Sequence, residues 1–214
     1  MYFLSTLFFL GVNSVLINGN PTKGRVIFAH GAGAPMDSEF MEVVGAKLTD
    51  IGLEVIRFEF PYMQKRRSDG KKRPPDRAPV LIDYFETLIS RFDDESTPLF
   101  LAGKSMGGRM ATMLADHPAV SEVFVFGYPF HPPGKPEKLR IEHLQELQTT
   151  VHIFQGTRDA MGNSEEVNQY NLAKNVKIHW LEDGNHDLKP RKSSGLTQEE
   201  HINSAIQFIR ESLN

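Results

Sequence analysis

Gly103-Lys104-Ser105-Met106-Gly107 is a G-x-S-x-G stretch between the apolar run Pro98–Ala102 and a helix-like segment, Gly108–Asp116. A serine in this pattern, between a strand and a helix, is typical of a sharp turn that exposes a nucleophilic hydroxyl. The chain reverses so tightly that side chains two residues before and after the serine would collide, and glycine avoids the collision. The serine then adopts a strained backbone conformation, with neighbouring N–H groups facing the reaction centre. The stretch therefore predicts a strand–turn–helix unit with Ser105 as a nucleophile.

The composition of the chain fits one sizeable domain with a full core, because 40% of its 214 residues are hydrophobic and 24% are charged. A formal net charge of −3 gives no overall attraction to nucleic acid, so we expect no nucleic-acid partner. The absence of cysteine excludes disulfides, a cysteine nucleophile and thiolate metal sites. The histidines His30, His117, His131 and His143 show no metal-ligand spacing, and we expect neither a metal nor a cofactor.

The N-terminus is uncharged and apolar, and we expect residues 1–13 to form a tail ahead of a single domain over residues 14–214. A secretory signal is the alternative, but no Lys or Arg precedes the apolar run and no small-x-small cleavage site follows it. Asn13 and Ser14 interrupt a run already shorter than the roughly 20 residues of a membrane span, so no stable span is expected. We expect Val15–Ile17 to belong to the first strand and the protein to be cytoplasmic, with secretion or membrane anchoring as the minority alternative.

Strand-like and helix-like segments alternate from about residue 14 to the end. This pattern predicts an α/β fold, a mostly parallel sheet with helices on both faces, and little or no cap domain. Strands are expected at 25–29, 53–60, 98–102, 123–126, 151–154 and 176–180, and helices at 79–92, 108–116 and 198–213. A further helix begins after Asp37 or Ser38, because Phe40, Met41, Val44 and Leu48 follow at three- and four-residue spacing.

Two further polar segments follow strand-like runs, and function in open α/β sheets lies at the carboxyl ends of the strands. Asp159 ends the segment Gln155–Asp159, and His186 lies in Asp183–Asp187 after the last strand. His186 can accept the proton of the Ser105 hydroxyl, and Asp159 can orient the imidazole and stabilise its cation. We therefore predict a catalytic triad of Ser105, Asp159 and His186.

Other acidic residues compete for the role of Asp159. Asp183 and Asp187 both lie too close in sequence to His186 to come from the expected strand end. The alternative interpretation of Asp159 is an ordinary turn or capping residue.

An oxyanion hole needs two backbone donors aimed at the developing negative charge. One is predicted to be the N–H of Met106, the residue after the nucleophile, and the other to come from the loop after the strand at 25–29. Ala32 and Gly33 are the candidates, because the small residues of that loop let the backbone approach a substrate.

Three stretches together resemble one group of small α/β-hydrolases. They are Phe28–Ala34 (FAHGAGA), Leu101–Arg109 (LAGKSMGGR) and Gln155–Asp159 (QGTRD). The group is related to a testis-expressed protein and to the third subunit of the NSL acetyltransferase complex, and is loosely similar to dienelactone hydrolases. The resemblance covers about residue 14 to the end and implies the α/β-hydrolase fold and the triad roles given above. Dienelactone hydrolases use a cysteine nucleophile, so their substrate is not carried over to a chain with Ser105.

The segment Gln64–Arg77 is strongly basic and follows a predicted strand end, so we expect it to be a loop on the catalytic side of the sheet. The common interpretation of such a run is a solvated loop, but cations there could select an anionic substrate or an acidic protein. The candidate substrate-binding residues are His30, Lys104, Arg66, Arg67 and Arg73.

These features predict a serine hydrolase that acts through an acyl-enzyme on a small-molecule carboxylic ester or thioester, with an anionic substrate as one option. The alternative is a non-catalytic interaction module that retains the fold and uses the basic segment for docking.

Overall fold

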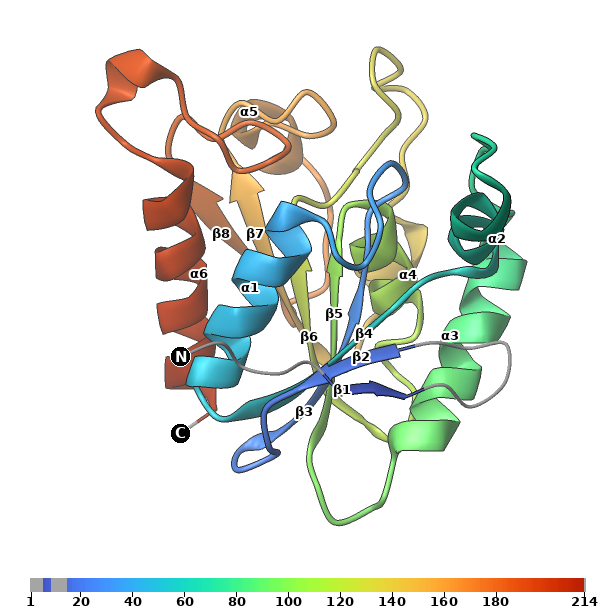
Figure 1. Cartoon of the computed structure of the whole chain (residues 1–214). Coiled ribbons are helices and arrows are strands. Elements are labelled where there is room, and N and C mark those ends of the chain that lie inside the picture. The colour runs from blue at the N-terminus through green and yellow to red at the C-terminus, as the bar shows by residue number, and fades with distance from the viewer. Residues whose placement is uncertain (1–5, 9–14, 214) are drawn as a thin grey trace.

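The computed structural model describes residues 6–8 and 15–213 and places them around one eight-stranded sheet (Figure 1). The strands are β1 Thr6–Phe8, β2 Val15–Asn18, β3 Gly24–Ala29, β4 Leu53–Phe58, β5 Leu99–Lys104, β6 Val120–Phe126, β7 Thr150–Gly156 and β8 Val176–Leu181. The helices are α1 Glu39–Asp50, α2 Pro61–Asp69, α3 Ala78–Phe92, α4 Met106–Met113, α5 Ser164–Val167 and α6 Gln198–Ser212, with short 3₁₀ turns at Glu142–Gln145 and Lys192–Ser194. Apart from β1, the predicted tail lies outside the described residues.

The sheet has the strand order β1-β2-β4-β3-β5-β6-β7-β8. Strands β3 to β8 run parallel, and β1 and β2 are added antiparallel at one edge. The predicted mostly parallel sheet is confirmed. Val15–Ile17 forms a strand as expected, but that strand is β2 and not the first one, because β1 precedes it in the chain. The connections at the carboxyl ends of the strands carry only loops and short helices, so the expectation of little or no cap domain also holds within the described residues.

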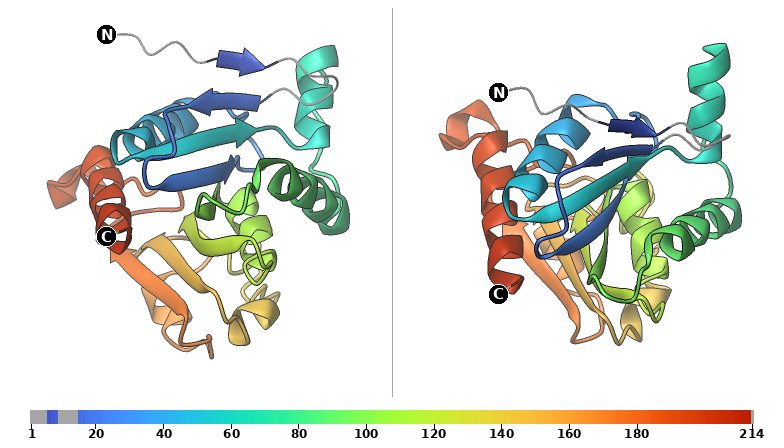
Figure 2. Two further views of the ribbon diagram at one scale, coloured as in Figure 1. Left: turned by 90° about the horizontal axis from the view of Figure 1, so that it is seen from below. Right: turned by 60° about the horizontal axis from the view of Figure 1, so that its bottom comes forward.

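Helices cover both faces of the sheet (Figure 2). On one face, α1 and α6 pack on a cluster that includes Phe28, Phe124 and Phe154, and on the other, α3 and α4 pack on a cluster that includes Ile27 and Leu101. The expected inward faces are buried, as at Met41, Val44 and Leu48 of α1 and at Ile202, Ala205, Ile206 and Ile209 of α6. Within residues 6–8 and 15–213, no helix combines the length and the apolar character needed to cross a lipid bilayer.

The basic segment differs from the prediction of a loop, because its first part is the helix α2. Pro61 occupies the first turn of that helix, where its fixed φ suits the helix and its missing N–H costs nothing. Gly70 ends the helix in the left-handed conformation at φ 70°. The prediction of a loop was wrong for Gln64–Asp69 because mostly polar helices leave no hydrophobic periodicity to detect.

The turn after β5 has the strained geometry expected from its glycines. Ser105 has φ 51° and ψ −116°, a backbone conformation that side-chain-bearing residues rarely adopt. A Cβ on Gly107 would lie 2.5 Å from the carbonyl oxygens of both Ala29 and His30 at the end of β3. A Cβ on Gly103 would collide with the backbone of Gly107. The glycines therefore let α4 start directly against β3.

Adding a methyl group at Gly107 should destabilise the protein, because its contacts are backbone oxygens that cannot rotate away. We expect Gly107→Ala to lower the free energy of unfolding by about 1–3 kcal/mol or more, measured by urea denaturation. Gly31→Ala is the matched control, because the nearest atoms to its added Cβ lie 3.6 Å away. Equal stability of the two variants would contradict the steric argument.

A pair of histidines lies under α6, on the last two strands of the sheet. His152 Nδ1 is 3.0 Å from His179 Nε2, and both rings pack against Phe208. Burial, with a smaller contribution from His152, lowers the pKa of His179 to about 4. The folded protein therefore favours neutral His179, whereas the unfolded chain takes up a proton near pH 6.5.

The contribution of neutral His179 to stability is present above about pH 6.5 and is lost as the pH falls towards 4. Between these values, the free energy of unfolding should fall more steeply in the wild type than in His179→Gln, by up to about 1.4 kcal/mol per pH unit. Urea denaturation at several pH values measures both slopes. Parallel pH profiles would contradict this assignment.

Candidate functional site

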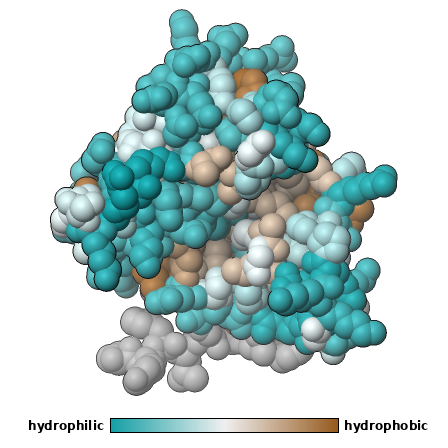
Figure 3. Space-filling view, turned by 90° about the horizontal axis from the view of Figure 1, so that it is seen from above, coloured by the Kyte–Doolittle hydropathy of each residue, from teal (hydrophilic) through white to brown (hydrophobic). Residues whose placement is uncertain are grey.

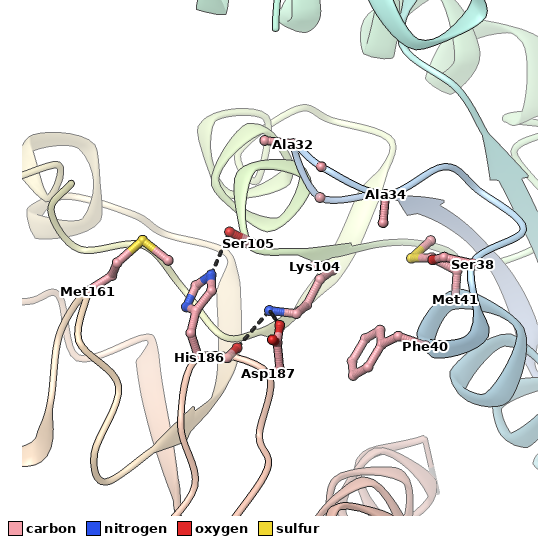
Figure 4. Close-up of a pocket in the computed structure, with 12 residues that line it drawn as sticks. Ala32, Ala34, Ser38, Phe40, Met41, Lys104, Ser105, Met161, His186 and Asp187 are labelled. Carbon is pink, nitrogen blue, oxygen red and sulfur yellow. Dashed lines mark hydrogen bonds and ion pairs between the residues drawn. The ribbon is translucent and has the colours of Figure 1, made fainter. Parts of the chain in front are cut away.

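Three predicted residues come together at the carboxyl end of the sheet, each from its own strand. Ser105 follows β5, Asp159 follows β7 and His186 follows β8. His186 Nε2 lies 2.7 Å from Ser105 Oγ, and its Nδ1 lies 2.7 Å from Asp159 Oδ2. Since a carboxylate can only accept hydrogen bonds, Nδ1 of His186 carries the ring proton, and Nε2 is free to accept a proton from the serine. Figure 4 shows the imidazole turned towards Ser105.

Asp159 is fully buried and its carboxylate is held by hydrogen bonds from several sides. Oδ1 accepts from the N–H of Met161 at 2.8 Å, and Oδ2 accepts from Gln155 Nε2 at 2.8 Å as well as from His186. Gln155 is itself buried and fixed by Gly162 O and by the backbone of Tyr128. These bonds hold the carboxylate in one orientation towards His186.

The competing acids have other partners. Asp183 binds Arg191 and Arg158, and the hydrogen bonds with Arg191 lower its pKa to about 2. Asp187 is exposed and lies 3.3 Å from Lys104 Nζ. Neither carboxylate takes the position that Asp159 occupies against His186 Nδ1.

The predicted oxyanion donors lie beside Ser105. Met106 is the first residue of α4, so its N–H has no intrahelical acceptor. Ala32 and Gly33 lie on the loop after β3, where Tyr62 Oη donates to the carbonyl oxygen of Ala32 at 3.0 Å. That bond turns the Ala32 carbonyl towards α2 and fixes the loop.

Two cavities meet at Ser105, and Ala32 and Met161 line both. The first has a volume of about 290 Å³ and is lined also by Gly33, Phe40, Met41, Lys104, His186 and Asp187. The second has a volume of about 350 Å³ and is lined also by Asp76, Leu81, Met106, Arg109, Met110 and Arg140. Figure 3 shows this face of the molecule as a hollow of weakly apolar residues between hydrophilic flanks.

Comparison with known proteins assigns the chain to a family. The model of a family described as "Alpha/beta hydrolase domain" matches residues 22–214. The chain belongs to this alpha/beta hydrolase family.

Solved structures of other hydrolases have the same fold as this α/β hydrolase. A monoacylglycerol lipase from Paleococcus ferrophilus superposes with a TM-score of 0.71 at 14% identity, over 94% of this chain and 99% of that one. A dienelactone hydrolase from Anabaena variabilis gives a TM-score of 0.70 at 17% identity, over 98% of this chain and 95% of that one. An α/β serine hydrolase without a lid from Xanthomonas campestris gives a TM-score of 0.68 at 16% identity, over 98% of this chain and 91% of that one. At these identities the likenesses show the fold.

Lys104 lines the first cavity, but its ammonium group is used within the protein. Its side chain is buried, and Nζ donates to the carbonyl oxygen of His186 at 2.7 Å and pairs with Asp187. Burial lowers the pKa of Lys104, while Asp187 partly restores it. Lys104 thus holds the loop that carries His186, as Figure 4 shows, and its predicted contact with a substrate stays a prediction.

His30 is a buried support of the loop after β3 and lines neither cavity. Its Nδ1 donates to Gly31 O at 2.7 Å, and its Nε2 accepts from the N–H of Phe60 at 3.1 Å. Burial lowers its pKa, so the ring is neutral. With both nitrogens engaged, His30 does not offer the substrate contact predicted from the sequence.

The predicted arginines of the basic segment also line neither cavity. Arg67 pairs with the buried Glu59 at 2.6 Å and with Asp37 at 2.8 Å, and these bonds raise its pKa. Arg73 pairs with Asp69 at 2.6 Å, and Arg66 lies half-buried on α2. The basic segment is thus partly neutralised by its own neighbours.

Arg109 and Arg140 are the cations of the second cavity, and sequence reasoning did not select them. The sequence did contain a signal for Arg109, which is the fourth residue after Ser105. In a helix, residues four apart lie about one turn apart and therefore on the same face. Arg140 lies in the long connection after β6, where no periodicity predicts which side chain points inward.

Replacing Lys104 should slow the chemistry at Ser105 by loosening the His186 loop. We expect Lys104→Met to reduce the rate of labelling by a fluorophosphonate about 10-fold or more, because a charge-assisted hydrogen bond is lost and His186 O stays unpaired. Lys189→Met is the matched control, since Lys189 lies exposed on the same loop. Equal labelling rates would show that the loop holds its position without Lys104.

Proposed function

We propose that this α/β hydrolase is a serine hydrolase that cleaves a carboxylic ester or thioester through an acyl-enzyme at Ser105. The supporting observation is the continuous hydrogen-bonded chain Ser105–His186–Asp159, with 2.7 Å at both links. Attack by Oγ on the substrate carbonyl transfers the serine proton to His186 Nε2, and buried Asp159 stabilises the resulting imidazolium.

The N–H groups of Met106 and Ala32 would hold the oxyanion. Ala32 is preferred over Gly33 because it lines both cavities that meet at Ser105, whereas Gly33 lines only the first. When the tetrahedral intermediate collapses, His186 returns the proton to the leaving oxygen or sulfur. Water then attacks the acyl-enzyme, His186 takes its proton, and the acid leaves as Ser105 is regenerated. None of these steps needs a cofactor, and the cytoplasmic location expected from the sequence stays a prediction.

A fluorophosphonate probe tests the nucleophile directly. We expect the wild type to be labelled covalently, Ser105→Ala to lose all labelling, and Ser121→Ala, at an exposed serine of β6, to be labelled as the wild type. Hydrolysis of p-nitrophenyl esters should follow the same pattern, and Asp159→Asn should reduce turnover by about 10³–10⁴-fold because the imidazole loses its orienting partner.

Folded wild-type protein that is neither labelled nor active on any ester would contradict the proposal. The non-catalytic interaction module would then be the better description of the chain.

A further inference from the structure

Two arginines, Arg109 and Arg140, line the second cavity at Ser105. Neither Arg109 nor Arg140 forms an ion pair with a carboxylate of residues 6–8 or 15–213. Arg109 Nε is buried and makes no hydrogen bond within that part of the chain. Burial and the nearby charge of Arg109 both lower the pKa of Arg140. Two partly buried like charges that line one cavity repel each other, and an anion bound there would relieve the repulsion.

The chemistry at Ser105 indicates which part of a substrate would occupy this cavity. His186 must protonate the leaving group, and it lines the first cavity but not the second. The leaving group therefore belongs in the first cavity and the acyl group in the second. Arg109 lies one helical turn after Ser105, since its backbone N–H donates to the backbone carbonyl oxygen of Ser105 at 2.9 Å, and both residues line the second cavity.

The remaining lining of the second cavity suits a short hydrocarbon segment. Leu81, Met110 and Met161 supply apolar surface to the same cavity as Ser105 and the arginines. Asp76 also lines the cavity, but its Oδ2 has no hydrogen-bond partner among the described residues and it pairs with neither arginine. The cavity thus keeps a net positive charge beside an apolar wall.

We propose that this cavity is a carboxylate-binding acyl subsite, so that the substrate is an ester or thioester of a dicarboxylic acid whose free carboxylate pairs with Arg109 and Arg140. Guanidinium groups bind carboxylates through paired N–H donors, which fits this assignment. This inference rests on the proposed function of Ser105. It names the acyl group, which the sequence left open, and it assigns the anion recognition to residues other than the basic segment.

The test compares two esters of equal length. Mono-p-nitrophenyl adipate carries a terminal carboxylate, and p-nitrophenyl 6-oxoheptanoate carries a neutral methyl ketone in its place. Adipate is used because the carboxylates of shorter diacid monoesters attack their own ester. The quantity measured is the ratio of kcat/KM for the anionic ester to kcat/KM for the neutral one.

We expect the wild type to favour adipate, and Arg109→Met and Arg140→Met each to reduce the ratio by about 10- to 100-fold, the effect of removing a hydrogen bond to a charged group. Arg109→Lys should retain part of the preference. Arg210→Met is the control, since Arg210 is exposed on α6, and should leave the ratio unchanged. Thermal denaturation checks that each variant is folded, and if Arg109→Met does not fold, Arg140→Met and Arg109→Lys decide the question.

A wild type that hydrolyses both esters equally, or a ratio unaffected by either arginine, would overturn the subsite while leaving the serine hydrolase intact. Failure of both esters together with absent fluorophosphonate labelling would instead reject the function of Ser105 itself.

Discussion

The close approach of α4 to the end of β3 is the constraint on which the site depends. Gly107 lies so near the carbonyl oxygens of Ala29 and His30 that no side chain fits there. Ser105, two residues before Gly107, has the strained φ of 51°. The contact also brings the start of α4, where Met106 lies, against the end of β3, from which the loop with Ala32 continues. The nucleophile and both proposed oxyanion donors are therefore positioned by one backbone contact between two elements of the core.

Buried polar groups hold the loops of the site at fixed positions. Asp159 is bound by Gln155 and by the backbone N–H of Met161, and Lys104 ties the His186 loop to β5. A buried charge is costly without partners, so each of these groups is stable only in the arrangement that satisfies it. The same reasoning makes the arginines of the second cavity notable, because neither forms an ion pair among the residues that the structure describes.

The sequence predicted the sheet, its two helical layers and the three residues that meet at its carboxyl end. Ser105, Asp159 and His186 could be found because each follows an apolar run, and chain order then restricts the pairing. The helix α2 was missed because charged residues dominate it. The role predicted for His30 was not found, because its side chain is buried and both ring nitrogens are hydrogen-bonded inside the protein.

The sequence alone determined the features that depend on the sterics of a few neighbouring residues. These are the apolar runs that form strands and the glycines that permit the turn at Ser105. Tertiary structure decided which cations are free to meet a substrate. Arg67 is paired with Asp37 and Glu59, whereas Arg109 and Arg140 line the cavity and form no ion pair within residues 6–8 and 15–213. The physical reason is that charge pairing depends on distance in space, and folding brings together partners that lie far apart in the chain.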